Sequence, residues 1–412
     1  MTKKLNTIEL FAGCGGFVDG FAKSGKYNTL ACVEWNRQAC EVLKKRLKNK
    51  YNISEVDKKV IRFDIQRTDE LLNGWNNDKD YGNGEGLKKL IGNNDVDLIV
   101  GGPPCQAYSI AGRIQDENGM HDDYRNYLFE SYIKVVEEFT PKIIVFENVE
   151  GILSAKPGGE SIIDRIMKAF DEVGYTITNN IRKNALLDLS MFGIPQKRKR
   201  VILIGLRKEY FGENCENLLD DLYKNKLPRY QVEKIKSVKD AIADLPKLVP
   251  NDKDIKIGRK KYSHSPESTD YLDHYPRYHN KRDIEIFREL ALDIENGINK
   301  YSSTDALKKM YTEKTGKKSN IHKYNVLKWD EPSNTIPAHL KKDGLRHIHP
   351  DYLQARSITV REAARLQSFD DDFEFSGMMT ADYEMIGNAV PPEFARRLAE
   401  CIYEFYKKSM TY

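Results

Sequence analysis

The sequence predicts an α/β protein built on a parallel sheet, with a smaller polar region inserted before the last helix. Apolar segments of strand length alternate with helical patterns along residues 5–205, the order that βαβ units produce. Several of these strands end on a glycine turn or a polar side chain, as strands of α/β enzymes do where they meet a ligand. Residues 206–355 lose this periodicity, and it returns near residue 356.

Composition limits the type of protein. The 412 residues suffice for two or three domains, and no apolar stretch approaches the roughly 18 residues of a membrane span. The N-terminus lacks a secretory apolar region. The six cysteines form no Cys-x-x-Cys pair, which favours a reducing cytosol and argues against disulfides or a zinc site. A net charge of +4 permits a polyanionic partner without requiring one.

The first predicted strand, over residues 5–11, runs into the glycine turn Ala12-Gly13-Cys14-Gly15-Gly16, and a helical pattern follows. This arrangement lets backbone N–H groups approach a ligand closely. The spacing matches neither the dinucleotide fingerprint nor a phosphate-binding loop. The next strand, over residues 29–33, ends at Glu34, about 20 positions after the turn, which suits ribose hydroxyls. A helix-capping carboxylate before Asn36 is the alternative interpretation.

Two further strands end on chemically active groups. The strand over residues 60–63 ends at Asp64, which could accept a hydrogen bond from an exocyclic amine, and residues 73–95 resemble a surface excursion. The apolar run that ends at Gly101-Gly102 is followed by two prolines and then Cys105. The prolines stiffen this corner, which holds the thiol at the carboxyl end of a buried strand. Most free cysteines are simply small buried hydrophobes, which is the competing interpretation.

The pattern continues beyond a long polar segment over residues 110–126, whose length favours a mobile lid. A helix over residues 127–139 leads into a buried strand that ends at Glu147, for which a solvated strand end is the alternative. A helix near 160–172 and strands near 175–184 and 200–205 complete the series. Between those strands lies Gln196-Lys197-Arg198-Lys199-Arg200, either a solvated hairpin or a strand with two guanidinium groups on one face.

The region 206–355 is basic and rich in tyrosine. It holds 29 Lys and Arg against 24 Asp and Glu, a net charge of +5, and seven of the eight histidines. This composition fits contact with phosphates and bases, and it equally fits an ordinary polar insert. Helices are predicted near 283–296 and 303–314. Another begins near Thr359, with a capping box to Glu362, and the last runs from Glu393 to about Tyr406.

These stretches, in this order, resemble the cytosine-5 DNA methyltransferase family of bacterial restriction-modification systems. The matching blocks are Phe11–Gly16, Gly102–Gln106 with Tyr108-Ser109, Glu147–Val149, Gln196–Arg200, Arg361–Phe369 and Gly387–Pro392. The resemblance implies a Rossmann-like S-adenosylmethionine-dependent methyltransferase sheet with a smaller target-recognition domain inserted before the C-terminal helix. Residues 1–205 would form the catalytic and cofactor-binding domain and 206–355 the recognition domain. Residues 356–386 would be a hinge that supports it, and 387–412 a return to the catalytic domain.

The resemblance also implies roles for individual residues. The catalytic residues would be Cys105 as nucleophile, Glu147 at the base, and Arg198 and Arg200. The S-adenosylmethionine site would be lined by Phe11, Ala12, Gly13, Gly15, Gly16, Glu34, Asp64, Pro103, Asn388 and Ala389. DNA would contact Gln106, Ser109, Arg198 and Thr335, the last from a weaker match over Pro332–Ile336. The block Arg125–Phe129 has Asn126 where the family usually has glycine. No metal is expected.

The implied reaction is transfer of a methyl group from S-adenosylmethionine to carbon 5 of a flipped-out cytosine, leaving S-adenosylhomocysteine. A thiol that adds to carbon 6 makes carbon 5 nucleophilic, which is covalent catalysis. The implied partners are double-stranded DNA and a cognate restriction endonuclease, and the chain is expected to be a cytoplasmic monomer without membrane contact. Two alternatives stay open: a transfer-RNA methyltransferase of the same family, which the long region 206–355 disfavours, and a non-catalytic DNA-binding relative.

Overall fold

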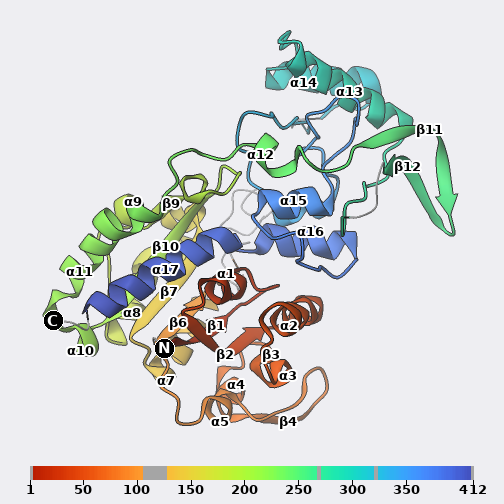
Figure 1. Cartoon of the computed structure of the whole chain (residues 1–412). Helices are drawn as coiled ribbons and strands as arrows, with labels where there is room; N and C mark the ends of the chain where they lie inside the picture. The colour runs from red at the N-terminus through yellow and green to blue at the C-terminus, as the bar shows by residue number, and fades with distance from the viewer. Residues whose placement is uncertain (1–2, 105–127, 267–270, 320–322, 410–412) are drawn as a thin grey trace. The chain divides into compact units, whose positions relative to one another are not determined.

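The computed structural model describes residues 3–104, 128–266, 271–319 and 323–409 (Figure 1). The chain divides into two compact units. The first contains Met1–Phe192, Arg198–Glu233 and Ala389–Tyr412, and the second contains Gly193–Lys197 and Lys234–Asn388. No helix in the described ranges is long and apolar enough to cross a membrane.

The first unit is built on a mostly parallel sheet. In spatial order its strands are β3 (Val60–Arg62), β2 (Tyr27–Glu34), β1 (Leu5–Leu10), β6 (Leu98–Gly101), β7 (Ile143–Val149), β10 (Lys199–Arg207) and β8 (Tyr175–Ile177), and β9 (Leu186–Asp188) also pairs with β10. The first five run parallel to one another. β10 runs antiparallel to β7, β8 and β9. The predicted α/β class is confirmed, with one antiparallel strand that the apolar pattern did not distinguish.

Helices complete this unit. They are α1 (Gly16–Ser24), α2 (Arg37–Tyr51), α3 (Val56–Lys59), α4 (Thr68–Asn73), α5 (Leu87–Ile91), α7 (Leu128–Phe139), α8 (Ile162–Glu172), α9 (Ile181–Asn184), α10 (Lys208–Phe211), α11 (Cys215–Asp221) and α17 (Pro392–Ser409). α1 packs against α17, and α7 packs against α8. The predicted last helix therefore joins the sheet unit, since the Tyr27 hydroxyl on β2 donates to the Ala399 carbonyl at 2.6 Å.

Two local expectations need correction. The strand predicted near 175–184 ends at Ile177, and α9 follows, because the Asn180 side chain accepts the Lys183 N–H and begins a helical turn. The excursion at 73–95 carries a small hairpin, β4 (Trp75–Asp78) and β5 (Gly82–Gly84), which is not wholly on the surface. Its Trp75 ring is buried and stacks on Phe63 with the ring centroids 4.0 Å apart.

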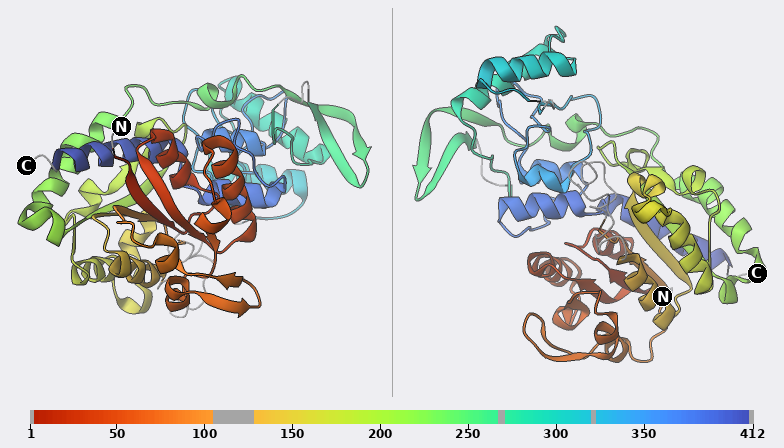
Figure 2. Two further views of the ribbon diagram at one scale, coloured as in Figure 1. Left: turned by 60° about the horizontal axis from the view of Figure 1, so that its bottom comes forward. Right: turned by 180° about the vertical axis from the view of Figure 1, so that it is seen from behind.

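The second unit contains a two-stranded hairpin and five helices among its described residues. The elements are α12 (Val238–Ile242), β11 (Leu248–Ile257), β12 (Lys260–Pro266), α13 (Lys281–Glu295), α14 (Thr304–Thr315), α15 (Val360–Leu366) and α16 (Met379–Asn388) (Figure 2). Phe287 and Leu290 of α13 pack with Met310 of α14 in one apolar cluster. The helices predicted near 283–296, 303–314 and 359–369 are confirmed, and Thr359 and Glu362 form the predicted capping box.

A buried polar network lies beneath α15 in the second unit. Arg356 donates to both carboxylate oxygens of Glu362, at 2.7 and 2.6 Å, with both side chains almost fully buried. His349 lies 3.5 Å from the same carboxylate. His274 contacts the Thr359 hydroxyl at 3.1 Å. Buried charges of this kind persist only when hydrogen bonds compensate them, and here both terminal nitrogens of Arg356 are paired with Glu362 while its buried Nε has no hydrogen-bond partner among the described residues.

Candidate active site

The carboxyl ends of the parallel strands gather the candidate residues of the first unit at one sheet edge. β1 leads into Phe11 and the glycine turn, and β2 ends on Glu34. β6 leads into Gly102 and Pro103, and β7 carries Glu147 near its end. Because parallel strands all end at the same edge, groups that are far apart in the sequence share one surface there.

Glu34 holds the glycine turn in place. Its Oε2 accepts the N–H of Gly13 at 2.7 Å, and its Oε1 accepts the N–H of Asn36 at 2.8 Å. Burial raises the pKa of this carboxyl, and the hydrogen bonds from Asn36 and Gly13 oppose that rise. The alternative of an exposed helix-capping carboxylate is wrong, because Glu34 is buried and the Asn36 side chain caps α2 by accepting the N–H of Ala39. The same carboxylate also ties the second strand to the turn, and each oxygen has a further lone pair for another donor.

The turn itself is conformationally unusual. Phe11 has a φ of +56°, which is rare for a side chain of that size and marks local strain. A Cβ placed on Gly16 would lie 2.2 Å from the Val390 carbonyl oxygen, and one on Gly15 would lie 2.5 Å from the Leu43 side chain. Packing against the Val390 backbone therefore requires glycine at position 16, and a φ of +97° favours it at position 15. Ala12 is buried and donates its N–H to Val33 at 3.0 Å.

Sequence reasoning missed Trp35. This residue follows Glu34 directly, and 61% of its surface is exposed although most large aromatic rings in the unit are buried. An exposed indole beside a strand end is suited to stacking on a flat ring. The signal in the sequence that could have indicated Trp35 was its position directly after Glu34. Asp64, at the end of the neighbouring strand, is half-buried and accepts the N–H of Gln66 at 3.0 Å, as turn residues often do.

Glu147 is fixed from two sides. Its Oε1 lies 2.9 Å from Nε of Arg200 on the adjacent strand β10. Its Oε2 lies so close to Gly102 that a Cβ placed on that glycine would be 2.6 Å away. The amide of Asn148 donates to the Pro103 carbonyl at 3.4 Å. The end of β7 therefore holds the corner after β6, and Cys105 follows that corner by two residues but lies outside the described residues, as do Gln106 and Ser109.

The two arginines of the block Gln196–Arg200 have different partners. Arg198 is 1% exposed and donates to the carbonyl of Ala389 at 3.1 Å, whereas Arg200 pairs with Glu147. Ala389 begins the segment that returns to this unit, and the preceding Asn388 is exposed at the end of α16. The interpretation of the block as a solvated hairpin is wrong, because Arg198 is buried.

The first two residues of the block Gln196–Arg200 belong to the second unit. Gln196 is fully buried, and its amide donates to Gln367 at 2.6 Å and accepts the N–H of Ile336 at 2.9 Å. Thr335 donates its hydroxyl to the carbonyl of Lys197 at 2.6 Å. The Thr335 side chain is only half-buried, so the structure gives it a backbone contact and leaves part of it accessible.

Comparison with known proteins identifies the family. A family model of C-5 cytosine-specific DNA methylases matches residues 5–404. The chain belongs to this family. It is 33% identical to the type II methyltransferase M.Bpa9945I of Bacillus paralicheniformis, over 96% of this chain and 98% of the relative. It is 31% identical to M.DdeI of Desulfomicrobium norvegicum, over 98% of this chain and 89% of the relative.

Solved structures agree on the fold. A prophage-encoded Escherichia coli protein, assigned as a DNA modification methyltransferase, gives a TM-score of 0.62 at 22% identity and covers 98% of this chain and all of its own. The Dnmt2 methyltransferase of S. pombe gives 0.54 at 17% identity, over 98% of this chain and 99% of its own. The chain therefore shares its fold with these two methyltransferases. The chain is a DNA (cytosine-5-)-methyltransferase with relatives in restriction-modification systems.

The other cysteines of this methyltransferase are poor nucleophiles. Cys14, Cys32, Cys40, Cys215 and Cys401 are all free and buried. Burial raises the pKa of Cys40 and of Cys401 to about 12 and also raises that of Cys32 and Cys215. A thiol reacts as its thiolate, so a raised pKa disfavours reaction. Cys14 and Cys105 each stand four residues after the end of a strand, and of these two Cys14 is buried.

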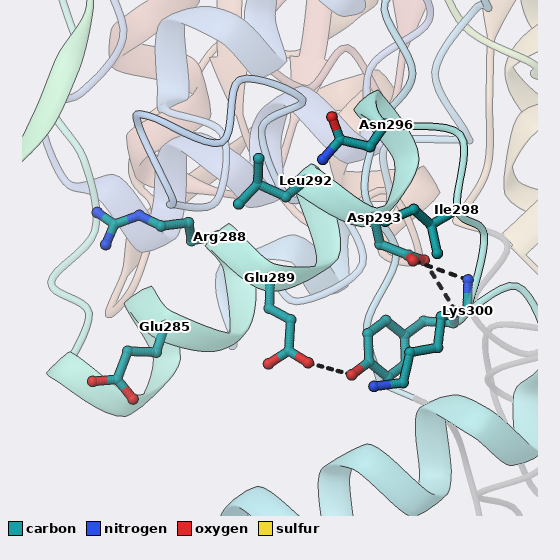
Figure 3. A pocket seen from close by; sticks show the side chains of 9 residues that line it. Glu285, Arg288, Glu289, Leu292, Asp293, Asn296, Ile298 and Lys300 are labelled. Atoms are coloured by element: carbon teal, nitrogen blue, oxygen red, sulfur yellow. Dashed lines mark hydrogen bonds between the residues drawn. The ribbon is translucent and has the colours of Figure 1, made fainter.

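A cavity of about 390 Å³ lies along α13 in the second unit of the methyltransferase (Figure 3). Two of its three acidic side chains, Asp293 and Glu289, already have partners. Asp293 accepts the N–H groups of Lys300 and Tyr301, at 2.9 and 3.0 Å, and Glu289 accepts the Tyr301 hydroxyl. None of the predicted site residues lines this cavity. Its contacts hold the segment after α13 in place and do not indicate a ligand.

Proposed function

We propose that this methyltransferase modifies carbon 5 of a flipped-out cytosine in a specific duplex DNA sequence, through a covalent bond between Cys105 and carbon 6 of the ring. The observation that carries the proposal is the fixed carboxylate of Glu147, held between Arg200 and Gly102 at the corner that leads to Cys105. Glu147 stands near the end of β7, and Cys105 follows the end of the neighbouring strand β6 by four residues in the sequence. A strand-end carboxyl beside a reactive thiol is the pair that addition to a pyrimidine requires.

The proposed chemistry assigns each group a step. The Cys105 thiolate forms a bond to carbon 6, and Glu147 in its protonated form donates a hydrogen bond or its proton to N3 as electron density moves into the ring. Arg200 keeps the carboxylate in place, and a guanidinium at this position can also contact the base carbonyl. Carbon 5 then bonds the incoming methyl group. Loss of the proton from carbon 5 restores the double bond and releases the thiolate.

The residues at the glycine turn fit S-adenosylmethionine, which supplies an electrophilic methyl group when bound. Glu34 is suited to the ribose hydroxyls because its oxygens are fixed by Gly13 and Asn36 and retain accepting capacity. Trp35 offers an exposed ring for the adenine. The contacts of Phe11, Asp64 and Asn388 with the cofactor remain part of this proposal.

The wider setting is also proposed. The second unit would recognise the target sequence on double-stranded DNA, and the type II relatives favour a role in protecting host DNA against a cognate endonuclease. A cytoplasmic monomer is the expected form. Base flipping is required because stacking hides the ring face that the thiol attacks, at a cost of a few kcal/mol. The lid predicted at residues 110–126 lies outside the described residues.

The test is a covalent trap. Duplex DNA from cells that express the enzyme is first analysed by bisulfite sequencing to find the methylated cytosine. The same duplex is then synthesised with 5-fluorocytosine at that position, since the fluorine cannot leave as a proton does. With S-adenosylmethionine present, the wild type should form a complex that resists denaturation, and Cys105→Ala should form none. A wild type that methylates transfer RNA but not the duplex would contradict the proposal.

A further inference from the structure

Among the described residues, the tip of the β11–β12 hairpin, residues 255–260, makes no hydrogen bond or ion pair with another element of the second unit, and the last such contact before it is the hydrogen bond from the Tyr278 hydroxyl to Asp254 at 2.9 Å. Figures 1 and 2 show it extending away from the other elements of that unit. Every residue from 252 to 261 is exposed. A two-stranded hairpin in water is only marginally stable on its own, because it has no face to bury. An extended ribbon of this kind is typical of an element that contacts another molecule.

The base of the hairpin is firmly anchored. Leu248 donates its N–H to the side chain of Gln354 at 3.0 Å, and His264 contacts the Gln354 carbonyl at 2.8 Å. The Ser263 hydroxyl accepts the N–H of His279 at 3.0 Å. At the far end, Gly258 has a φ of +59°, the conformation that tight hairpin turns require. The hairpin is therefore a defined arm with a fixed root and an exposed tip.

The exposed part of the arm is strongly basic. Residues 252–261 hold five Lys and Arg against two Asp, a net charge of +3. Lys256 pairs directly with Lys261 across the two strands, and like charges at such positions destabilise a hairpin. Asp254 lies 3.8 Å from Lys261, but Lys256, Arg259 and Lys260 form no ion pair within the described part of the chain. This arrangement costs stability unless an anion neutralises it.

The two faces of the arm differ. Lys256 and Lys261 share one face, and the other face carries Ile255 opposite Tyr262 and Ile257 opposite Lys260. Ile255 is 44% and Ile257 66% exposed. A two-stranded ribbon fits the major groove of DNA, which is about 12 Å wide, and basic side chains along it reach the phosphates on either side. In a DNA groove, apolar and anionic surfaces lie next to each other. The apolar and basic side chains on the faces of the arm match these surfaces.

We propose that the β11–β12 hairpin is a phosphate-binding arm for duplex DNA, with Lys256, Arg259 and Lys260 contacting the backbone. The inference rests on the proposed function, which gives duplex DNA as the partner. It adds that this hairpin supplies the part of the binding affinity that does not depend on sequence. Because phosphates are the same at every step of the duplex, the arm strengthens binding to target and unrelated sequences alike.

The test compares salt dependence. The variant K256Q/R259Q/K260Q removes the three unpaired charges at exposed positions, and its binding to target and unrelated duplexes is followed by fluorescence anisotropy between 50 and 200 mM salt. Each lost phosphate contact flattens the slope of log K against log salt by about 0.9. Between 50 and 200 mM salt, the affinity of the variant should therefore fall by a factor about 40 times smaller than the factor for the wild type. The thermal midpoint should stay equal or rise, because a repulsion is removed.

The control variant K88Q/K89Q/K168Q removes the same charge from exposed positions of the first unit and should keep the wild-type slope. A hairpin variant with the wild-type slope on both duplexes would overturn the proposal. So would a variant that loses affinity for the target duplex alone, because that result assigns base reading to the arm. Binding is measured without turnover. A wild type that binds duplexes but never methylates them would therefore refute the proposed function, whereas the salt slope of the hairpin variant would still decide this inference.

Discussion

At the scale of single residues, the site depends on a close approach that a side chain would block. Gly102 leaves room for the Glu147 carboxylate, whose Oε2 would lie 2.6 Å from a Cβ at that position. Arg200 holds the opposite oxygen. The ion pair with Arg200 thus holds one oxygen of the carboxylate, and the lack of a side chain at Gly102 leaves room for the other oxygen.

Gly102→Ala should therefore inactivate the enzyme without unfolding it. The added methyl group must displace the carboxylate, and a misplacement of about 1 Å in a catalytic group costs on the order of 100-fold in rate. The measurement is kcat for methyl transfer to duplex DNA, with the thermal midpoint and the DNA affinity as controls for folding and binding. Full kcat in this variant would show that Glu147 does not need its present position.

The sequence could locate Glu34 and Glu147 because each stands where an apolar strand ends. It could not show that Glu147 rests on Gly102, since that contact joins strands that are distant in the sequence. It also did not indicate Trp35, because an aromatic residue after a strand reads equally well as core. Burial of Arg198 was likewise hidden, since a run of alternating charges normally indicates a solvated surface.

At the scale of elements, the packing of α1 against α17 is unusually close. A Cβ on Gly20 would lie 2.4 Å from the Ala395 Cβ and 2.5 Å from the Pro392 carbonyl oxygen. Gly16 makes the same kind of approach to Val390. Two glycines one turn apart therefore let the backbones of these helices meet.

Gly20→Ala should destabilise the enzyme although alanine is the better helix former. Overpacking costs about 1–3 kcal/mol, which exceeds the roughly 1 kcal/mol that helix propensity returns. Urea denaturation should show this loss in the free energy of unfolding. Lys48→Ala at an exposed position of α2 is the control and should change it by no more than about 0.5 kcal/mol. Equal stability of the two variants would contradict the close packing.

Elements with local signals were predictable, and those decided by partners were not. The capping box at Thr359 and the period of α13 are read from neighbouring residues. The antiparallel direction of β10 depends on where β7 and β8 lie, which an apolar run does not reveal. The short helix α9 lies in a segment that read as strand, although the Asn180 cap with which it begins is itself a local signal.

At the scale of the whole molecule, the grouping of segments depends on contacts that composition does not show. The polar region was predicted to begin at residue 206, whereas residues up to Glu233 group with the sheet unit. The reason is visible at Tyr223, whose buried hydroxyl bridges the Ile204 N–H and the Ile202 carbonyl of β10, at 2.8 Å each. The role of each domain stays a prediction.

The second unit should lose stability in mild acid. Burial lowers the pKa of His264 and His347 to about 4 and that of His279 and His349 to about 3. An unfolded histidine has a pKa near 6.5, so the unfolded chain takes up protons that the folded unit excludes. The stabilising contribution is complete above about pH 6.5 and falls as pH drops toward 4.

Denaturation at a series of pH values tests this expectation. The free energy of unfolding should fall by on the order of 1 kcal/mol per pH unit for each of these histidines. His349→Gln should reduce the slope, whereas the same change at the exposed His339 should not. A free energy that stays constant from pH 7 to 5 would mean that the folded histidines take up protons as readily as the unfolded ones.

The packing of α17 on α1 has a consequence for biosynthesis. The ribosome makes α1 and β2 early, but the helix that covers them, and whose Ala399 accepts the Tyr27 hydroxyl, emerges only after the entire second unit. Until α17 has been made, the apolar surface that it covers on the nascent sheet unit stays exposed. This delay separates translation from the first methylation event. A newly expressed gene would therefore yield modification activity later than it yields full-length polypeptide.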